Sequence, residues 1–418
     1  MGLHLQVLSV DKGDTAWMLV ATILVLMMTL PGLALFYGGL VRSKNMLSIL
    51  SQVLGIVAVT ILVWVGWGYS LAFGQDDRAV IGTFTKVFFR GIDGTSLVPT
   101  FSPGAAIPEL VFAAFQMTFA AITASLIVGA LAERVKFTAI LLFTPIWLTV
   151  VYAPLAHMVW APGGFIFAMG ALDFAGGTVV HINAGVAGLV GVLFAGKRLG
   201  FLKEATPPHS LALALVGAGL LWVGWFGFNA GSALEASGLA AVAMVNTFVA
   251  PAAGVLAWMA IERIVSGKPS LLGGASGGLA GLVAVTPAAG TCGPLGAMLL
   301  AAAAACVCYW FVASVKHRLR IDDTLDVFGI HGLGGITGSL GTAFVTSPDF
   351  GGYGAADYAI VDQFLVQLAA VTVAILWSGA GSALAFWIVR RTIGLRVGRD
   401  EEREGLDLAD HGERAYNY

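Results

Sequence analysis

The sequence predicts an all-α membrane protein with eleven transmembrane helices, built as two inverted five-helix repeats followed by a long C-terminal helix. Three observations support this prediction: the composition, the placement of Lys and Arg between apolar runs, and a histidine pattern that occurs twice. Of the 418 residues, 58% are hydrophobic and 11% are charged, whereas a soluble domain has about 25% charged residues. The mean hydropathy is +0.88. These values exclude a soluble globular protein.

Eleven apolar runs are long enough to cross a bilayer, which takes about 20 residues in a helix. They lie at residues 16–38, 47–73, 110–132, 138–158, 176–195, 211–231, 238–262, 271–288, 294–315, 327–346 and 362–389. The eighth and tenth runs are rich in glycine, which weakens the helix prediction there. Residues 1–14 lack the basic start of a signal peptide, so the first run is expected to remain as a transmembrane helix.

The Lys and Arg residues between these runs predict how the chain is inserted. When alternate connections are assigned to opposite sides, one side carries 18 of the 22 basic residues. The other side carries only Lys12, Arg78, Lys86 and Arg90. Because cytoplasmic loops are enriched in Lys and Arg, we expect the amino terminus outside and the carboxyl terminus in the cytoplasm.

A histidine followed by the same glycine spacing occurs in the fifth and in the tenth run. His181 and His331 are each followed by glycines at four, seven and ten residues, which are Gly185, Gly188, Gly191, Gly335, Gly338 and Gly341. This spacing places the glycines along one stripe of a helix, where they permit close helix contacts. Since five spans are an odd number, a second copy is inserted inverted. We therefore expect repeats at 16–195 and 211–346, with the two histidines meeting at their junction.

Two neutral imidazoles in an apolar pore suit a small neutral solute. A hydrogen bond between the rings of His181 and His331 fixes both tautomers and leaves the other ring nitrogens facing the lumen. Moving an ion into such a passage costs on the order of tens of kcal/mol, whereas a small polar group costs only a few. The alternative is a pair of core histidines satisfied by backbone carbonyls. Their matched positions in two repeats favour the pore.

Aromatic residues near the outer ends of three runs are candidates for a cation site. Trp160 follows the fourth run, Phe119 and Phe228 lie deeper in the third and sixth runs, and Ser232 follows the sixth. A cation resting on aromatic faces gains about 0.5–2 kcal/mol, and a hydroxyl adds a hydrogen bond. By composition alone, an interfacial tryptophan and packing phenylalanines are the more common explanation.

Each histidine run is preceded by a Leu-Asp pair, although at different distances. Asp173, which is followed by Gly176, Gly177 and Thr178, can cap the helix or supply a negative field for a cation at the entrance. Asp326 lies at the start of the tenth run and is expected to act mainly as a cap.

The three cysteines, Cys292, Cys306 and Cys308, match no zinc or redox spacing and are expected to pack in or beside apolar helices. We therefore expect no metal ion and no cofactor. No catalytic residues are assigned, and the chain is not expected to be an enzyme.

Eight long motifs are spread over nearly the whole chain. They are FYGGLVRSKN (Phe36–Asn45), GALAERVKF (Gly129–Phe137), AHMVW (Ala156–Trp160), LDFAGGTVVHINAG (Leu172–Gly185), WFGFNAGSA (Trp225–Ala233), KPSLLG (Lys268–Gly273), VTPAAG (Val285–Gly290) and DVFGIHG (Asp326–Gly332). Together they resemble the ammonium transporters of the Amt/Mep/Rh family, on the Amt side. The resemblance implies a homotrimer with one pore per subunit in the inner (cytoplasmic) membrane of a bacterium. Residues 74–107, a long external loop, match no motif and receive no role.

The resemblance implies an external cation site and a gate. Trp160, Phe119 and Ser232 correspond to the family's cation site, and Asp173 corresponds to the acidic residue required near it. Phe119 and Phe228 correspond to the family's stacked phenylalanine gate.

The resemblance also implies roles for the pore and for the tail. His181 and His331 correspond to the paired histidines that line the family's pore. Residues 1–391 are expected to form the transport domain and residues 392–418 a cytoplasmic regulatory tail. The run EREGLDLADHGERAY (Glu402–Tyr416) resembles the family's segment that couples subunits and acts with a trimeric PII signalling protein to close the pore.

We therefore expect selective ammonium uptake, in which NH4⁺ is held at the outer site, loses its proton near the gate and crosses as NH3 past His181 and His331. Potassium is rejected because it has no proton to lose. Three alternatives are a membrane haem or metal protein that uses the two histidines as ligands, an ammonium sensor without flux, and a Rh-like channel for NH3 or CO2. The intact Trp160 and Ser232 pair argues against the last.

Overall fold

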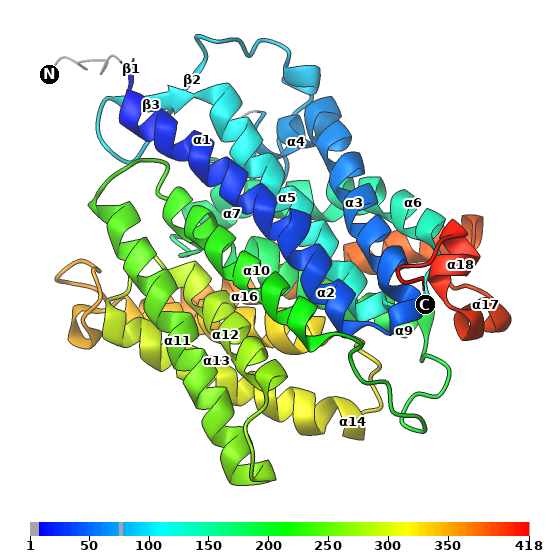
Figure 1. Cartoon of the computed structure of the whole chain (residues 1–418). Coiled ribbons are helices and arrows are strands. Elements are labelled where there is room, and N and C mark those ends of the chain that lie inside the picture. Colours follow the sequence, from blue (N-terminus) through cyan, green and yellow to red (C-terminus); the bar gives the residue numbers. More distant parts are fainter. Residues whose placement is uncertain (1–7, 75–77, 418) are drawn as a thin grey trace, which may run out of the picture.

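Long apolar runs satisfy their backbone amides as helices, because a bilayer offers the backbone no hydrogen-bond partner. The computed structural model describes residues 8–74 and 78–417. Helices run side by side through most of it (Figure 1). Within the described residues, ten helices are long and apolar enough to cross a membrane: Lys12–Leu40, Ser43–Phe73, Glu109–Leu131, Phe137–Ala168, Gly177–Ala195, Leu211–Gly231, Gly238–Ser266, Leu271–Ala288, Pro294–Arg318 and Ile360–Thr392.

Several of these spans are built from two or more consecutive helical elements. In the first half of the chain, the helical elements are α1 (Lys12–Met27), η1 (Met28–Leu33), α2 (Ala34–Leu40), η2 (Ser43–Asn45), α3 (Met46–Val63), η3 (Trp64–Gly68), α4 (Tyr69–Phe73), η4 (Val87–Phe89), α5 (Glu109–Leu131), α6 (Phe137–Trp147), η5 (Leu148–Tyr152), α7 (Ala153–Trp160), α8 (Phe165–Ala168), η6 (Gly177–Ile182) and α9 (Asn183–Ala195).

The second half continues in the same manner. Its elements are α10 (Leu211–Gly231), α11 (Gly238–Ser266), α12 (Leu271–Val285), η7 (Thr286–Ala288), α13 (Pro294–Trp310), η8 (Phe311–Val315), α14 (Lys316–Arg318), η9 (Phe328–Gly332), α15 (Leu333–Val345), η10 (Pro348–Phe350) and α16 (Ile360–Thr392).

Ten of the eleven predicted runs correspond to the ten candidate spans. The remaining run, 327–346, corresponds to η9 and α15, which together cover Phe328–Val345. This glycine-rich segment is not among the ten apolar spans of the described residues. The count of eleven spans, the inverted repeats and the orientation of the termini remain predictions.

One end of the helix bundle carries a small sheet, and we call it the sheet end. Strand β3 (Ala105–Pro108) lies between β1 (Ser9–Val10), to which it is parallel, and β2 (Leu97–Pro99), to which it is antiparallel. Glu109 connects the loop between α4 and β2 to the helix bundle. Its carboxylate pairs with Lys86 Nζ at 2.6 Å and accepts from the Tyr69 hydroxyl at 2.7 Å.

The opposite end carries the C-terminal segment, and we call it the tail end. Two short helices, α17 (Arg399–Glu404) and α18 (Leu406–His411), lie against the loops there (Figure 1). Glu402 pairs with Arg396 at 2.7 Å and accepts from the Leu199 amide at 2.6 Å. Asp407 accepts from the Ser48 amide at 2.8 Å, at the start of α3. The tail is therefore tied to the loop that follows α9 and to the start of α3.

A buried arginine joins the tail-end loops of the two halves. The Arg134 side chain is 0% exposed, and it donates to the carbonyl oxygens of Ala130 (3.1 Å), Gly196 (2.9 Å) and Asp322 (2.8 Å) and to the Thr324 hydroxyl (2.6 Å). A buried guanidinium costs free energy unless its donors are satisfied. These acceptors fix the loop that follows α9 and the loop that leads into η9.

Candidate functional site

A buried carboxylate caps the helix start that carries His181. Asp173 accepts hydrogen bonds from the Gly176 amide (2.9 Å), the Thr178 amide (3.0 Å) and the Val179 amide (3.2 Å), and the Thr178 hydroxyl also donates to it. Burial raises the pKa of Asp173, while the hydrogen bonds from Thr178 and the amides act in the opposite direction. The side chain is 8% exposed. Asp173 therefore caps η6. Capping is one of the two roles that the sequence predicted for it.

The corresponding cap before His331 is Asp323, and the prediction that Asp326 caps this helix was wrong. Asp323 accepts from the Val327 amide at 3.0 Å and from the Phe328 amide at 2.8 Å. It lies eight residues before His331, as Asp173 lies eight residues before His181. Asp326 instead has a left-handed backbone with φ of 59° and pairs with Lys316. The repeated Leu-Asp pair indicated Asp326, whereas the repeated distance to the histidine indicates Asp323.

The glycine stripes bring the two histidine helices into backbone contact. A Cβ at Gly185 would lie 2.3 Å from the Gly332 nitrogen and 2.4 Å from its Cα. A Cβ at Gly335 would lie 3.1 Å from the Gly177 carbonyl oxygen. Only glycine allows so close an approach at Gly185. Both histidines lie in π-helical turns, η6 and η9, an irregularity that often marks functional sites.

The structure places the two histidine rings against each other. The Nδ1 atoms of His181 and His331 are 3.2 Å apart, and both side chains are buried, at 1% and 7% exposed. One Nδ1 donates to the other, and burial in apolar surroundings favours the neutral form of both rings. Two neutral rings in this contact differ in tautomer. The two Nε2 atoms are consequently one acceptor and one donor. His181 Nε2 is buried without a hydrogen-bond partner in the structure.

Apolar side chains surround the histidines. A cavity of about 10 Å³ beside them has room for roughly one water molecule. Besides the two histidines, it is lined by Met28, Leu33, Phe36, Ile122, Leu126, Val180, Leu221, Trp225, Phe228 and Leu279. The Trp225 ring stacks on His181 with 5.4 Å between centroids, and its Nε1 donates to the Thr286 hydroxyl at 3.0 Å. The tryptophan therefore presents only its apolar ring to this cavity, which we call the passage.

Two stacked phenylalanines lie between this passage and the sheet end. The rings of Phe119 on α5 and Phe228 on α10 are parallel within 6°, with centroids 4.1 Å apart. Phe228 is also 6.0 Å from the His181 ring. Both side chains are buried. Phe228 also lines the cavity beside the histidines.

A cavity of about 230 Å³ at the sheet end collects the predicted cation-site residues. Trp160, Phe119, Ser232 and Asp173 all line it. The Trp160 ring lies 5.9 Å from Phe119 and at 81° to it, and its Nε1 donates to the Asp173 carbonyl oxygen at 3.0 Å. The Ser232 hydroxyl donates to the Phe228 carbonyl oxygen at 2.8 Å. Its oxygen therefore keeps its lone pairs for a donor in the cavity.

Comparison with known proteins places this arrangement in a family. The model of the Ammonium Transporter Family matches residues 16–416.

The chain belongs to the ammonium transporter family.

Individual relatives agree over nearly the whole length. The ammonium transporter of Aquifex aeolicus is 47% identical over 408 residues, which is 97% of this chain and 94% of the relative. The crystal structure of Saccharomyces cerevisiae Mep2 has a TM-score of 0.82 at 33% identity, covering 96% of this chain and 92% of Mep2. A structure described as a sensor Amt protein has a TM-score of 0.87 at 27% identity, covering 96% and 98%. This family member is thus a multi-pass membrane protein.

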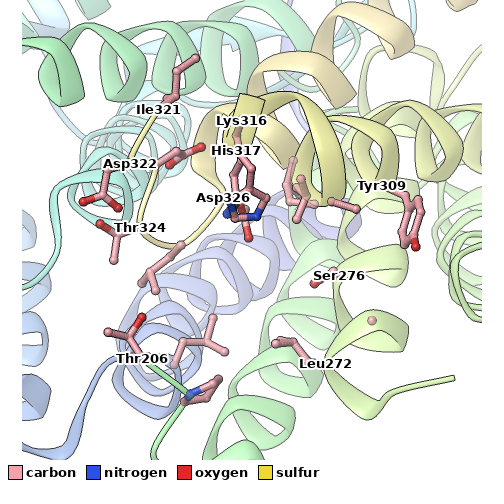
Figure 2. A pocket seen from close by; sticks show the side chains of 18 of the residues that line it. Thr206, Leu272, Ser276, Tyr309, Lys316, His317, Ile321, Asp322, Thr324 and Asp326 are labelled. Carbon is pink, nitrogen blue, oxygen red and sulfur yellow. The ribbon is translucent and has the colours of Figure 1, made fainter. Parts of the chain in front are cut away.

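A second and larger cavity opens at the tail end of this ammonium transporter family member. It has a volume of about 540 Å³ and extends to His331, which lines both this cavity and the passage. Figure 2 shows Lys316, His317 and Asp326 close together in it, with Asp322 and Thr324 beside them. His331 thus lies between this cavity and the passage, and the stacked Phe119 and Phe228 lie between the passage and the sheet-end cavity.

Sequence reasoning did not find several residues that build this site. Asp323 was missed although its distance to His331 repeats that of Asp173 to His181. The stacking of Trp225 on His181 and the pairing of Lys316 with Asp326 join distant or irregular segments. No local pattern in the sequence predicts such contacts.

Proposed function

We propose that this protein transports ammonium selectively, by recruiting NH4⁺ at the sheet end, removing its proton near the Phe119–Phe228 gate and conducting NH3 past His181 and His331. The observation that carries the proposal is the contact between the two histidine rings in an apolar passage. One acceptor and one donor Nε2 suit NH3, which both donates and accepts. Neither nitrogen supplies the charge that an ion needs.

The sheet-end cavity supports the recruitment step. An ammonium ion there can lie against the Trp160 and Phe119 rings, a contact that contributes about 0.5–2 kcal/mol. It can donate to the Ser232 oxygen, whose own proton is engaged with Phe228. Asp173 acts on the cation through its charge and not through direct contact, because its carboxylate oxygens accept hydrogen bonds from backbone amides. Its charge attracts the cation, and its backbone oxygen orients Trp160.

Deprotonation follows from the change of environment along the route. Beyond the gate, an ion meets the apolar lining of the passage, where its desolvation costs on the order of tens of kcal/mol, against a few for a small polar group. An ammonium ion avoids this cost by transferring one proton to water at the sheet end, which leaves H3O⁺ outside and NH3 to enter the passage. A potassium ion of similar size cannot do so, which makes the passage selective.

The orientation, the assembly and the regulation are part of the same proposal. The excess of Lys and Arg in the tail-end loops supports a cytoplasmic location for that end, beneath the inner membrane of a bacterial cell. The family resemblance supports a homotrimer with one pore in each transport domain (residues 1–391). It also supports a regulatory tail (392–418) that acts with a PII signalling protein. The contacts of α17 and α18 with the loops after α2 and α9 support a tail that responds to the state of the bundle.

Sensing is the second candidate function, because one of the structurally similar proteins is described as a sensor Amt protein. In that case ammonium binds at the sheet end and little or no NH3 passes. Flux separates the two functions, since a sensor binds without transport.

Uptake of radiolabelled methylammonium into proteoliposomes, recorded together with the transmembrane current, tests the proposal. The wild type is expected to accumulate the label, and His181→Ala and His331→Ala are each expected to change the rate about tenfold or more, since each removes a polar contact in the passage. His317→Ala, which removes a histidine at the tail-end cavity, serves as the control and is expected to behave as the wild type. Unchanged flux in both pore variants would remove the histidines from the pathway. Binding without flux in the wild type would favour the sensor.

A further inference from the structure

The tail-end cavity is acidic, and one lysine lies at its inner end. Five carboxylates line it, from Glu204, Glu262, Asp322, Asp323 and Asp326, against the two strong bases Arg198 and Lys316. A cavity with this excess of negative charge and low-dielectric walls concentrates cations from the adjacent solution. Under the proposed function, that solution is the cytoplasm and the cavity leads directly to His331.

Most of the carboxylates near the pore are already engaged. Asp322 forms a pair with Arg198, with 2.8 Å between Oδ1 and Nη2. Asp323 accepts from the backbone amides at the start of η9. Glu262 belongs to a different element, α11, and accepts from the Ser270 amide at 2.6 Å. Asp326, five residues before His331, is the remaining carboxylate on the segment that leads into the histidine turn.

Asp326 is occupied by a cation that belongs to the protein. Lys316 Nζ forms an ion pair with its carboxylate, and Figure 2 shows the two residues in the same cluster. The Lys316 side chain is 13% exposed and that of Asp326 is 27% exposed. The carboxylate is thus open to the cavity but not free. A lysine head group is a primary ammonium with three N–H donors, which is the chemistry of the proposed substrate.

We propose that Lys316 is a tethered cation that occupies Asp326 at the inner mouth of the pore and thereby keeps cytoplasmic potassium or ammonium ions from binding below His331. This inference rests on the proposed transport function and adds a residue that protects inward flux. Without Lys316, Asp326 would hold a free cation at the point where NH3 leaves the passage. Such an ion would obstruct the exit and couple uptake to the cytoplasmic potassium concentration.

A potassium titration from the inside tests this role. Proteoliposomes are selected for a lumenal tail by the inaccessibility of a C-terminal tag. The initial rate of methylammonium uptake is then measured while lumenal potassium replaces N-methylglucamine at constant ionic strength. The wild type and Lys316→Arg are expected to be insensitive to lumenal potassium. As lumenal potassium replaces N-methylglucamine, the uptake rate of Lys316→Met is expected to fall about threefold to fivefold. This is the range expected for a partly exposed carboxylate–cation pair.

The double variant Lys316→Met/Asp326→Asn locates the effect. It removes the carboxylate together with the lysine, so its uptake should again be independent of lumenal potassium. A structural ion pair alone would lower the melting temperature of Lys316→Met without producing any potassium dependence. Should Lys316→Met not yield folded protein, Lys316→Gln carries the same expectation, because its side chain can still donate to Asp326 but has no charge.

Two results would overturn the inference: potassium-independent uptake in folded Lys316→Met or Lys316→Gln, or inhibition that persists in the double variant. A wild type that fails to take up methylammonium even without lumenal potassium would instead contradict the proposed function. The failures of the two proposals are therefore distinguishable.

Discussion

At the scale of single residues, the chemistry of the sheet-end cavity depends on where hydroxyl and amide protons are already engaged. Ser232 donates to the Phe228 carbonyl oxygen, so toward the cavity it is an acceptor. The same holds for the pair of histidines, where the Nδ1–Nδ1 contact determines what each Nε2 offers. Recruitment of a cation and passage of a neutral molecule thus follow from the assignment of a few protons.

Replacing Ser232 with alanine should weaken recruitment more than conduction. A hydrogen bond to a charged partner contributes about 1.5–3 kcal/mol, so the apparent KM for methylammonium uptake should rise about tenfold or more while the maximal rate changes less. Thr372→Ala is a matched control, because Thr372 also donates to a carbonyl four residues earlier, at 2.8 Å, but on an exposed helix face. An unchanged KM in Ser232→Ala would exclude the hydroxyl from the cation site.

At the scale of elements, the ends of the helices are held by charged side chains that are buried and paired. Glu133 is 3% exposed and pairs with Arg42 at 2.8 Å and with Arg198 at 3.2 Å. Burial by itself raises the pKa of Glu133, but Arg42 and Arg198 outweigh it and hold the pKa below its usual value. Glu133 therefore contributes stability above the ordinary carboxyl pKa of about 4.3, and this contribution is lost as pH falls through the lowered folded-state pKa.

Glu133→Gln should consequently lower the melting temperature of the purified protein at neutral pH, by an amount corresponding to on the order of 3 kcal/mol. On acidification below about pH 4, the melting temperature of the wild type should fall by more than that of the variant, because the variant has already lost the charge. Asp400→Asn, whose side chain is 99% exposed, should match the wild type at both pH values. Equal acid losses in Glu133→Gln and the wild type would show that Glu133 is not a source of the acid sensitivity.

The elements also show what the sequence could predict and what it could not. The apolar runs and the repeated histidine–glycine spacing were sufficient to anticipate ten spans and a meeting of His181 with His331, because both depend on local periodicity. The π-helical turns at the histidines, the cap by Asp323 and the pair of Lys316 with Asp326 were not predicted. They depend on how irregular helix starts meet loops that are distant in the chain. Arg134, which donates to Asp322 and Thr324, is another contact of this kind.

At the scale of the whole molecule, the route has a different character in each of its three parts. The sheet-end cavity offers aromatic faces and an acceptor, the middle is apolar with two neutral imidazoles, and the tail-end cavity is acidic, with the carboxylate of Asp326 paired with Lys316. A cation can thus bind in the sheet-end cavity, but the apolar middle excludes it and Lys316 keeps it from the inner mouth of the pore. The central claim is that the species in the middle is NH3 and not an ion.

Comparing two labelled cations in the same proteoliposomes tests this claim most directly. Methylammonium can lose a proton, whereas rubidium, a substitute for potassium, cannot. With equal inward gradients of the two ions, the account predicts protein-dependent accumulation of methylammonium and rubidium uptake no greater than in protein-free vesicles. Protein-dependent rubidium uptake at a rate comparable to that of methylammonium would contradict it, because an ion without a proton would then have crossed the passage between Phe228 and His331.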